Sequence, residues 1–441
     1  MKLTTRALAL LPSGTLPVGI GLGVLGVASY VHLAVAGHDL SKPGDAALSV
    51  LWVIVFCLGL GLFFPIEQEL IRHVAARAVT GEGIAPVVRR GAVLAGIILL
   101  AVLVPLAVAA RPLADKLFGG DIGMVAALGG AFLALAVVSV SRGVLAGMGR
   151  FHAYGAQLGI DGGLRVVFAG ALGISGERSP VMFGLILTAA PVLSAVFTLG
   201  PTVRDLRPGP AITWLQLCRG LGLLIGSSLL AQLVVNVAVI NADLLSPGHP
   251  AVVAALLDGM VVARVPLFIF ASLQAALLPG LAGAIAAGQF RQFWRLLGRA
   301  SAMVAGLGLA GGLLAVIFGP WLIPVLFGAR HILGPADFAL LATGTTCYML
   351  AMVLGQGAMA VSRHRDQLLA WAAGAVVLGV ITFLPGEVRL RVEAAYALSS
   401  LTVALVLGLV VLLRVPRPGG PDPEPGAGQT APAASLTGDT R

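Results

Sequence analysis

The sequence predicts an all-α polytopic membrane protein, with about 12 transmembrane helices in two parallel six-helix lobes. Three observations predict this fold: the composition, the succession of apolar runs and an internal repeat. Of the 441 residues, 58% are hydrophobic and only 11% are charged, and the mean hydropathy is +1.00. A soluble monomer of this composition would expose far more apolar surface than folded proteins tolerate. The chain is therefore expected to lie in a lipid bilayer.

The apolar runs give the predicted element boundaries, because a helix needs about 20 residues to cross the hydrocarbon core of a bilayer. The first six predicted spans are residues 16–36, 46–66, 91–110, 122–145, 157–174 and 181–200. The second six are residues 220–241, 252–278, 300–318, 338–360, 368–384 and 394–413. The predicted domains are an N-terminal lobe over 16–200 and a C-terminal lobe over 220–413, joined by a cytoplasmic linker over 201–219. Residues 1–15 are predicted to be a cytoplasmic N-terminus, and residues 414–441, rich in Pro, Gly and Ala, a disordered cytoplasmic tail.

The distribution of basic residues gives the predicted orientation. With the N-terminus inside, nineteen of the 28 Lys and Arg residues fall on the inner side and seven on the outer side. Such an excess marks the cytoplasmic side of a membrane protein. Both termini are therefore predicted to be cytoplasmic, and the net charge of +9 is expected to face anionic lipid rather than nucleic acid.

An internal repeat relates the two predicted lobes. Residues 111–120, after the third span, read RPLADKLFGG, and residues 319–328, after the ninth, read GPWLIPVLFG. Both segments contain Pro, an apolar pair, a spacer and Leu-Phe-Gly. Because the repeat is six helices long and six is even, the two halves have the same orientation. They are then expected to be related by an axis along the membrane normal, with a substrate site at mid-membrane between them.

Charged residues interrupt one of the longest apolar runs. Asp258 and Arg264 lie in the eighth predicted span, with Pro266 and Pro279, and Gln274 lies further along the same run. A charge near the bilayer centre costs about 2.5–3.5 kcal/mol on insertion scales, so such a residue normally faces protein, water or a ligand. The prolines predict a kinked helix. We expect Arg264 to face a cavity and to hold an anionic substrate group.

Two further groups of polar residues lie within spans. Ser228, Gln232, Asn236 and Asp243 fall within an arc of about 80° on the seventh span, which is typical of helix packing or of a surface facing water or substrate. Asp161 and Arg165 are spaced i and i+4, so they form either a structural or a functional ion pair. The candidate substrate-binding residues are therefore Arg264, Arg165, Gln232, Asn236, Asp243, Asp258 and Gln274.

Several common cofactor patterns are not supported. Gly21, Gly23 and Gly26 match the G-x-G-x-x-G pattern, but they lie inside an apolar run with no preceding strand, which favours close helix packing over a dinucleotide site. The three cysteines and seven histidines have no metal-ligand spacing, and no phosphate-binding G-x-x-x-x-G-K-[ST] segment occurs. We expect neither a cofactor nor a metal.

Three segments resemble the multidrug/oligosaccharidyl-lipid/polysaccharide exporter superfamily. The residues that resemble its eighth helix are Arg264, Pro266, Phe268, Phe270, Leu273, Leu277, Leu278 and Pro279. Residues 147–154, GMGRFHAY, resemble the turn between helices 4 and 5 of bacterial polysaccharide flippases, and residues 67–72, EQELIR, resemble their second loop. The motif residues are Glu67, Gln68, Arg72, Gly147, Gly149 and Arg150. The run 67–77 is interpreted as an interfacial continuation of the second span.

The resemblance implies two lobes around a central cavity that rock between inward-open and outward-open states. It implies a transporter, not an enzyme, that flips a polyprenyl-pyrophosphate-linked oligosaccharide across the cytoplasmic membrane during cell-surface polysaccharide biosynthesis. The implied partners are this lipid-linked oligosaccharide, membrane lipids, and a polysaccharide polymerase or glycosyltransferases. No nucleic acid is implied.

Alternatives within and outside this superfamily remain. A lipid II flippase is expected to have fourteen helices and arginines in its first span, where this chain has Tyr30 and His32 as the notable polar residues. A proton-coupled multidrug exporter is expected to carry an acid in that span, but Asp39 falls in the predicted outer loop. The longest outer loop, 319–337, offers few acids or bases for a glycosyltransferase or polymer ligase. A non-transporting scaffold would have little need for charges at membrane depth.

The predicted topology is testable by labelling. A reporter fused after Arg414 should be cytoplasmic, and a cysteine replacing Ser179 should react with an impermeant reagent added outside, because positive charge is retained on the inner side. Labelling from the opposite side at either position would contradict the twelve-span arrangement with the N-terminus inside.

Overall fold

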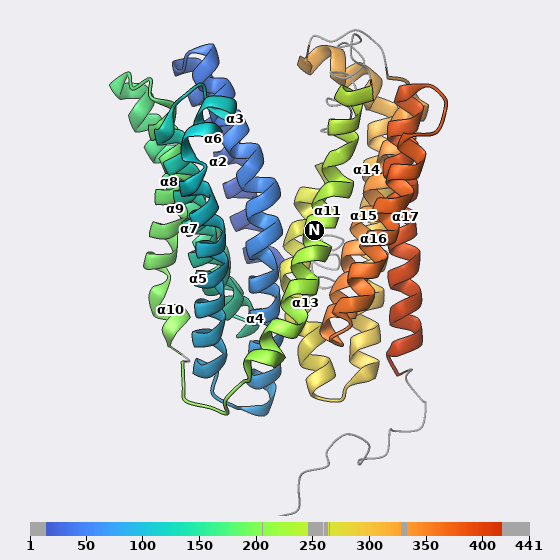
Figure 1. Ribbon diagram of the computed structural model, residues 1–441. Coiled ribbons are helices and arrows are strands. Elements are labelled where there is room, and N and C mark those ends of the chain that lie inside the picture. Colours follow the sequence, from blue (N-terminus) through green and yellow to red (C-terminus); the bar gives the residue numbers. More distant parts are fainter. Residues whose placement is uncertain are drawn as a thin grey trace, which may run out of the picture.

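The computed structural model describes residues 15–204, 206–245, 259, 263, 265–327 and 333–416, and all regular structure in these ranges is helical (Figure 1). Within them, eleven helical segments are long and apolar enough to cross a membrane. The predicted fold class is confirmed: the protein is an all-α polytopic membrane protein with two bundles of helices.

The described helices follow the predicted order. The first bundle contains α2 Thr15–Asp39, α3 Lys42–Ile54, η1 Val55–Gly59, α4 Leu60–Thr80, α5 Ala85–Val108, α6 Ala110–Leu117, α7 Ile122–Gly147, α8 Phe151–Ser175, α9 Pro180–Phe197 and α10 Leu199–Val203. The second contains α11 Trp214–Leu245, α13 Val265–Ala286, α14 Phe290–Phe327, α15 Pro335–Ala360, α16 His364–Thr382 and α17 Val388–Arg414. We call these bundles the N-lobe and the C-lobe.

Some predicted boundaries are wrong. The span predicted at 46–66 is part of a continuous segment, Lys42–Thr80, in which the π-helical turn η1 joins α3 to α4. The predicted eighth span ends at 278, whereas α13 continues to Ala286, because Pro279 is accommodated inside the helix. The predicted ends lie directly before Glu67 and Pro279, and the helix continues through both residues.

The repeated segments differ in their local structure. In the N-lobe the helix is interrupted at Ala109, so Pro112 lies in the separate short helix α6. In the C-lobe the corresponding Pro320 lies inside the 38-residue helix α14. The turns that precede α5 and α14 are more alike, because Gly81 follows α4 with φ of 71° and Gly288 follows α13 with φ of 68°. Glycine readily adopts this left-handed conformation at a helix C-terminus.

The two lobes converge at one end and diverge toward the other (Figure 1). They meet mainly through α2 and α4 of the N-lobe and α11 and α13 of the C-lobe. The converging end carries the α4–α5 turn, the α15–α16 turn and the last residues of α17. Ile71 and Leu158 of the N-lobe belong to the same buried apolar cluster as Leu278 of the C-lobe, so the contact between the lobes is continuous with the C-lobe core.

Glycines bring α2 and α8 into backbone contact, as the glycine pattern in the first span predicts. A side chain on Gly21 would collide with the Gly155 carbonyl group, and a Cβ on Gly162 would lie 2.9 Å from Leu25 Cα. Such a Cβ distance requires the backbones to shift. The close packing joins α2, which faces the C-lobe, firmly to the rest of the N-lobe.

Two adjacent glycines provide a test of this packing. Gly162→Ala should lower the apparent melting temperature of the purified protein, because overpacking at a backbone contact costs about 1–3 kcal/mol. Gly163→Ala is the matched control, since nothing lies within 4 Å of a Cβ at that position. Equal melting temperatures for the two variants would contradict the close α2–α8 contact.

Candidate functional site

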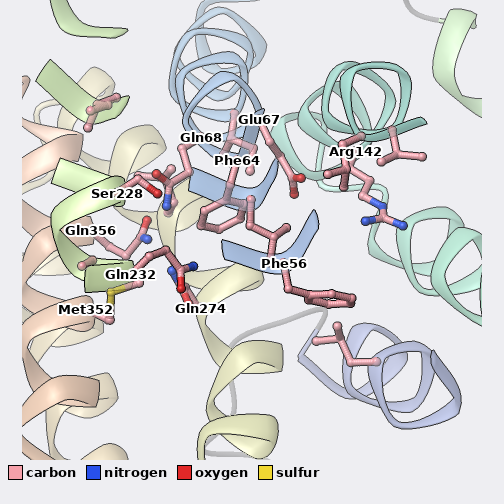
Figure 2. A pocket seen from close by; sticks show the side chains of 18 of the residues that line it. Phe56, Phe64, Glu67, Gln68, Arg142, Ser228, Gln232, Gln274, Met352 and Gln356 are labelled. Atoms are coloured by element: carbon pink, nitrogen blue, oxygen red, sulfur yellow. The ribbon is translucent and has the colours of Figure 1, made fainter. Parts of the chain in front are cut away.

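A cavity of about 380 Å³ lies between the two lobes. Its N-lobe wall comes from α2, η1, α4, α7, α8 and α9, and its C-lobe wall from α11, α13, α15 and α16. Figure 2 shows side chains from both lobes directed toward the same space. Such a position, between two repeated bundles, is where polar ligand groups can be reached from both halves of the molecule.

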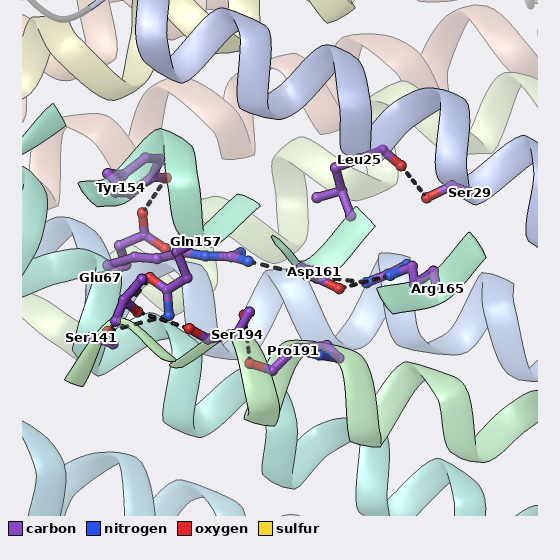
Figure 3. A network of polar contacts seen from close by, with 12 residues as sticks. Leu25, Ser29, Glu67, Ser141, Tyr154, Gln157, Asp161, Arg165, Pro191 and Ser194 are labelled. Carbon is purple, nitrogen blue, oxygen red and sulfur yellow. Dashed lines mark hydrogen bonds and ion pairs between the residues drawn. The ribbon is translucent and has the colours of Figure 1, made fainter. Parts of the chain in front are cut away.

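The N-lobe wall contains a carboxylate held between two guanidinium groups (Figure 3). Asp161 of α8 is 1% exposed. Its Oδ1 accepts a hydrogen bond of 2.9 Å from Arg165 Nε, and its Oδ2 lies 3.3 Å from Arg142 Nη2 of α7. Arg165 also lies over the Trp52 ring, 5.9 Å from its centroid. The buried negative charge is therefore compensated by two positive charges.

Each of these arginines has a donor atom without a hydrogen-bond partner in the described part of the chain. Arg165 Nη1 and Arg142 Nε are buried and lack hydrogen-bond partners among the described residues. A buried N–H group without an acceptor is costly, so these groups favour an acceptor supplied by water or a ligand. The arrangement can therefore accept an anionic or hydroxyl oxygen without first breaking the Asp161 ion pairs.

A second acid links two of the family-like motifs. Tyr154, the last residue of the GMGRFHAY segment, donates a 2.8 Å hydrogen bond from its hydroxyl to Glu67 Oε1, the first residue of EQELIR. Both side chains are buried and line the cavity. Behind them, Ser141 and Gln157 are joined by a side-chain hydrogen bond. Residues 87 positions apart in the sequence thus position one carboxyl group at the cavity wall.

The C-lobe wall is polar but has no charged residue among its described members. It carries Ser227, Ser228, Gln232, Gln274, Gln356 and Gln367, interleaved with Tyr348, Met352 and Trp371. Gln274 Nε2, Gln356 Oε1 and Gln367 Oε1 are buried and lack hydrogen-bond partners in the described part of the chain. These amides therefore have unused hydrogen-bonding capacity directed at a partly apolar space.

A polar cluster connects the lobes at the converging end. Glu69 and Arg72 of α4 are joined by a hydrogen-bonded ion pair, and Arg72 Nη1 donates a 2.9 Å hydrogen bond to Ser362 Oγ of the C-lobe. His364 Nε2 lies 3.8 Å from Glu69 Oε2. A Cβ on Gly220 would lie 2.5 Å from the His364 ring, so glycine permits this approach. We call Glu69, Arg72, Ser362 and His364 the interlobe clasp.

The structure corrects the interpretation of residues 67–77. They continue the second span, as predicted, because they belong to α4 within the continuous segment Lys42–Thr80, but they form no loop, and Glu67, Gln68 and Glu69 are buried. Their charged side chains are accommodated because Tyr154, Arg72 and the C-lobe provide partners. The burial of these polar residues could not be predicted, because their partners are distant in the sequence.

The other predicted residues fall in different places. Arg165, Gln232 and Gln274 line the cavity. Arg264 and Asp258 lie outside the described residues, and for Asn236 and Asp243 only the helical backbone of α11 is described.

The predicted motif residues Gly147, Gly149 and Arg150 form the turn between α7 and α8 and contact neighbouring segments of the N-lobe. Arg150 Nη1 donates a 2.8 Å hydrogen bond to the Pro201 carbonyl oxygen, Gly149 has φ of 68°, and Gly147 lies against Val74.

Sequence reasoning missed several cavity residues, among them Arg142, Gln356 and Gln367. Arg142 lies inside the predicted fourth span, 122–145, but it is counted among the nineteen basic residues of the inner side. The available signal was its position inside an otherwise apolar run, next to Ser139 and Ser141. Its pairing with Asp161, 19 residues away on another helix, could not be read from helical periodicity.

Comparison with known proteins agrees with this architecture. No family model matches the sequence. A Mycobacterium tuberculosis protein described as uncharacterized is 26% identical over 412 residues, which cover 90% of this chain and 91% of the relative. Another M. tuberculosis protein with the same description is 26% identical over 282 residues, or 62% of each chain.

Solved structures show the same fold. A MATE transporter in complex with MaL6 superimposes with a TM-score of 0.76 at 14% identity, covering 91% of this chain and 94% of the other. A MOP superfamily transporter from Pyrococcus furiosus gives the same values. An outward-facing multidrug resistance MATE family transporter gives a TM-score of 0.73 at 15% identity with the same coverage. The chain therefore has the MATE-like fold of the MOP superfamily, which is the fold implied by the sequence resemblance.

Asp161 is expected to be required for stability. Asp161→Asn would leave two buried guanidinium groups without their carboxylate, and breaking a buried ion pair in this way costs about 3–5 kcal/mol. We expect a markedly lower melting temperature and yield, measured on detergent-purified protein. Glu82→Gln is the control, because Glu82 is exposed and 3.8 Å from Arg77, and exposed pairs contribute about 0–1 kcal/mol. An Asp161→Asn protein as stable as the control would contradict the compensating role of the pairs.

Proposed function

We propose that the protein is a membrane transporter that flips a polyprenyl-pyrophosphate-linked oligosaccharide from the inner to the outer leaflet of the cytoplasmic membrane by alternating access. The MATE-like fold supports transport as the general activity. The observation that supports this substrate class is the cavity itself, which combines buried arginine donors on one wall with several glutamines and aromatic rings on the other.

The two walls suit two parts of such a substrate. Amide groups both donate and accept hydrogen bonds, as the hydroxyl groups of a sugar do. Gln274, Gln356 and Gln367 each have a polar atom with no hydrogen-bond partner among the described residues. The Trp371 and Tyr348 rings add apolar surface for sugar faces. On the opposite wall, the guanidinium groups of Arg142 and Arg165 suit a phosphate through charge-assisted hydrogen bonds.

The proposed topology indicates which state of the transport cycle this conformation represents. With both termini cytoplasmic, the end at which the lobes converge faces the cytoplasm, and the interlobe clasp closes that side. The lobes diverge toward the outside (Figure 1). The conformation then corresponds to an outward-facing state, and release of the clasp accompanies the change to the inward-facing state.

A multidrug exporter is the second candidate. Phe56, Phe64, Leu22 and Leu25 give the cavity a substantial apolar surface, and one structural neighbour is described as a multidrug resistance transporter. A cationic drug would need an acidic partner. Asp161 is already engaged by two arginines and Glu67 by Tyr154, which favours the saccharide substrate.

Two neighbouring cavity residues on α15 test the proposal. In liposomes containing the purified protein and a fluorescent lipid-linked oligosaccharide, Gln356→Leu should slow flipping roughly fivefold, because a lost hydrogen bond to a neutral group is worth about 1 kcal/mol. Met352→Leu, one helical turn away in the same cavity, should transport at nearly the normal rate. Flipping of polyprenyl pyrophosphate without sugar should be insensitive to Gln356→Leu.

The same liposomes distinguish the alternative function. A protein that exports ethidium but flips the lipid no faster than protein-free liposomes would refute the proposed substrate. Equal loss of flipping in the Gln356→Leu and Met352→Leu proteins would refute the proposed contact between the glutamine and the sugar.

A further inference from the structure

A second hollow lies away from the central cavity, at the converging end of the molecule. This groove of about 820 Å³ runs between the first turns of α5 and the segment 206–214 that leads into α11. It therefore lies at the seam where the N-lobe is followed by the C-lobe. Its lining residues are Ala85, Pro86, Val88, Arg89, Arg90, Ala92, Val93, Leu206, Pro208, Gly209, Ala211 and Trp214.

The lining of the groove is positively charged. Arg89 and Arg90 are the charged members of the described lining, and no described lining residue is acidic. The Arg90 guanidinium lies over the Trp214 ring, 5.0 Å from its centroid, which fixes its orientation. Arg90 Nη1 is buried and has no hydrogen-bond partner in the described chain. This leaves a positioned cationic donor without an acceptor, which favours an anion.

The surroundings of the groove distinguish a lipid from a soluble anion. On α5, the groove continues from Arg89 and Arg90 to Val93, which is 45% exposed, and the next turns present Ile97 and Leu100, which are 53% and 61% exposed. A positive site is thus followed along the helix axis by an exposed apolar strip. A phospholipid has this same order of groups, from a negatively charged phosphate to its acyl chains, and Trp is common at the boundary between them.

The walls of the groove are held in place by backbone contacts. Ala85 N donates a 3.1 Å hydrogen bond to the Arg207 carbonyl oxygen. Gly83 and Gly209 pack so closely that a side chain on either would collide with the other segment's backbone. The groove is therefore a formed site rather than a gap between independent loops.

We propose that this groove binds one anionic phospholipid of the inner leaflet, with its phosphate at Arg90 and Arg89 and an acyl chain along Val93, Ile97 and Leu100. The lipid would contact α5 of the N-lobe and Trp214 at the start of the C-lobe. Binding is a property separate from transport, so it can be tested without a transport substrate.

The test is a lipid titration of the full-length protein in detergent, followed by native mass spectrometry. Phosphatidylglycerol should remain bound at one site, phosphatidylcholine should bind much more weakly, and millimolar inorganic phosphate should not displace the bound lipid. Arg90→Gln should weaken phosphatidylglycerol binding about tenfold, and Arg90→Lys should weaken it less. Arg291→Gln, which removes an exposed charge at the start of α14 in the other lobe, is the matched control and should bind normally.

A second variant makes the test independent of Arg90. Ala92→Trp places a bulky side chain at an exposed position in the groove and should also reduce binding. Melting temperatures of the variants show whether each is folded. Normal phosphatidylglycerol binding by folded Arg90→Gln or Ala92→Trp protein would overturn the proposal. Equal loss in Arg291→Gln, equal binding of phosphatidylcholine, or displacement by inorganic phosphate would overturn it as well.

Discussion

The need to compensate charge inside a membrane protein determines how the N-lobe is organised. Asp161 is almost completely buried, and it is held by Arg165 from its own helix and Arg142 from α7. Without both partners, a charge at this depth would cost several kcal/mol. The ion pairs fix α7 relative to α8, and the α2–α8 glycine contact adds the helix that faces the C-lobe. The charged wall of the cavity is consequently part of one rigid unit.

The distribution of polar contacts suits a molecule that changes conformation between two lobes. The ion pairs of Asp161 lie entirely within the N-lobe, so separation of the lobes leaves them intact. Among the described residues, the contacts that cross between lobes include apolar packing, the Arg72–Ser362 hydrogen bond and the approach of His364 to Glu69. These can exchange for water at modest cost, because Arg72 remains paired with Glu69 when Ser362 leaves. Relative motion of the lobes would therefore break neither the Asp161 ion pairs nor the Glu69–Arg72 pair.

The sequence was sufficient for the fold because hydropathy and repeat symmetry are properties of the chain alone. It also predicted that Asp161 and Arg165 could pair, since i, i+4 spacing places them on one helix face. Partners from other helices could not be predicted. Arg142, near the inner end of the predicted fourth span, was counted with the inner-side charges, and Glu67, directly after the second span, was assigned to an interfacial segment. In both cases a charge near the end of an apolar run was interpreted as the membrane boundary. The Asp161 carboxylate that pairs with Arg142 is 19 residues away, and the Tyr154 hydroxyl that binds Glu67 is 87 residues away.

The connection between the lobes explains where relative motion would have to be absorbed. Segment 206–209 is attached to the N-lobe through the Ala85–Arg207 hydrogen bond and the Gly83–Gly209 contact. A few residues later, Thr213 and Gln216 exchange side-chain to backbone hydrogen bonds at the start of α11, as in a capping box. Ile212, Leu217 and Leu221 nevertheless belong to the buried apolar cluster of the N-lobe, whereas Leu224 belongs to that of the C-lobe. The first turns of α11 are therefore held by the N-lobe, and relative motion of the lobes would have to be absorbed within α11, beyond Leu221, rather than in the segment that precedes the helix.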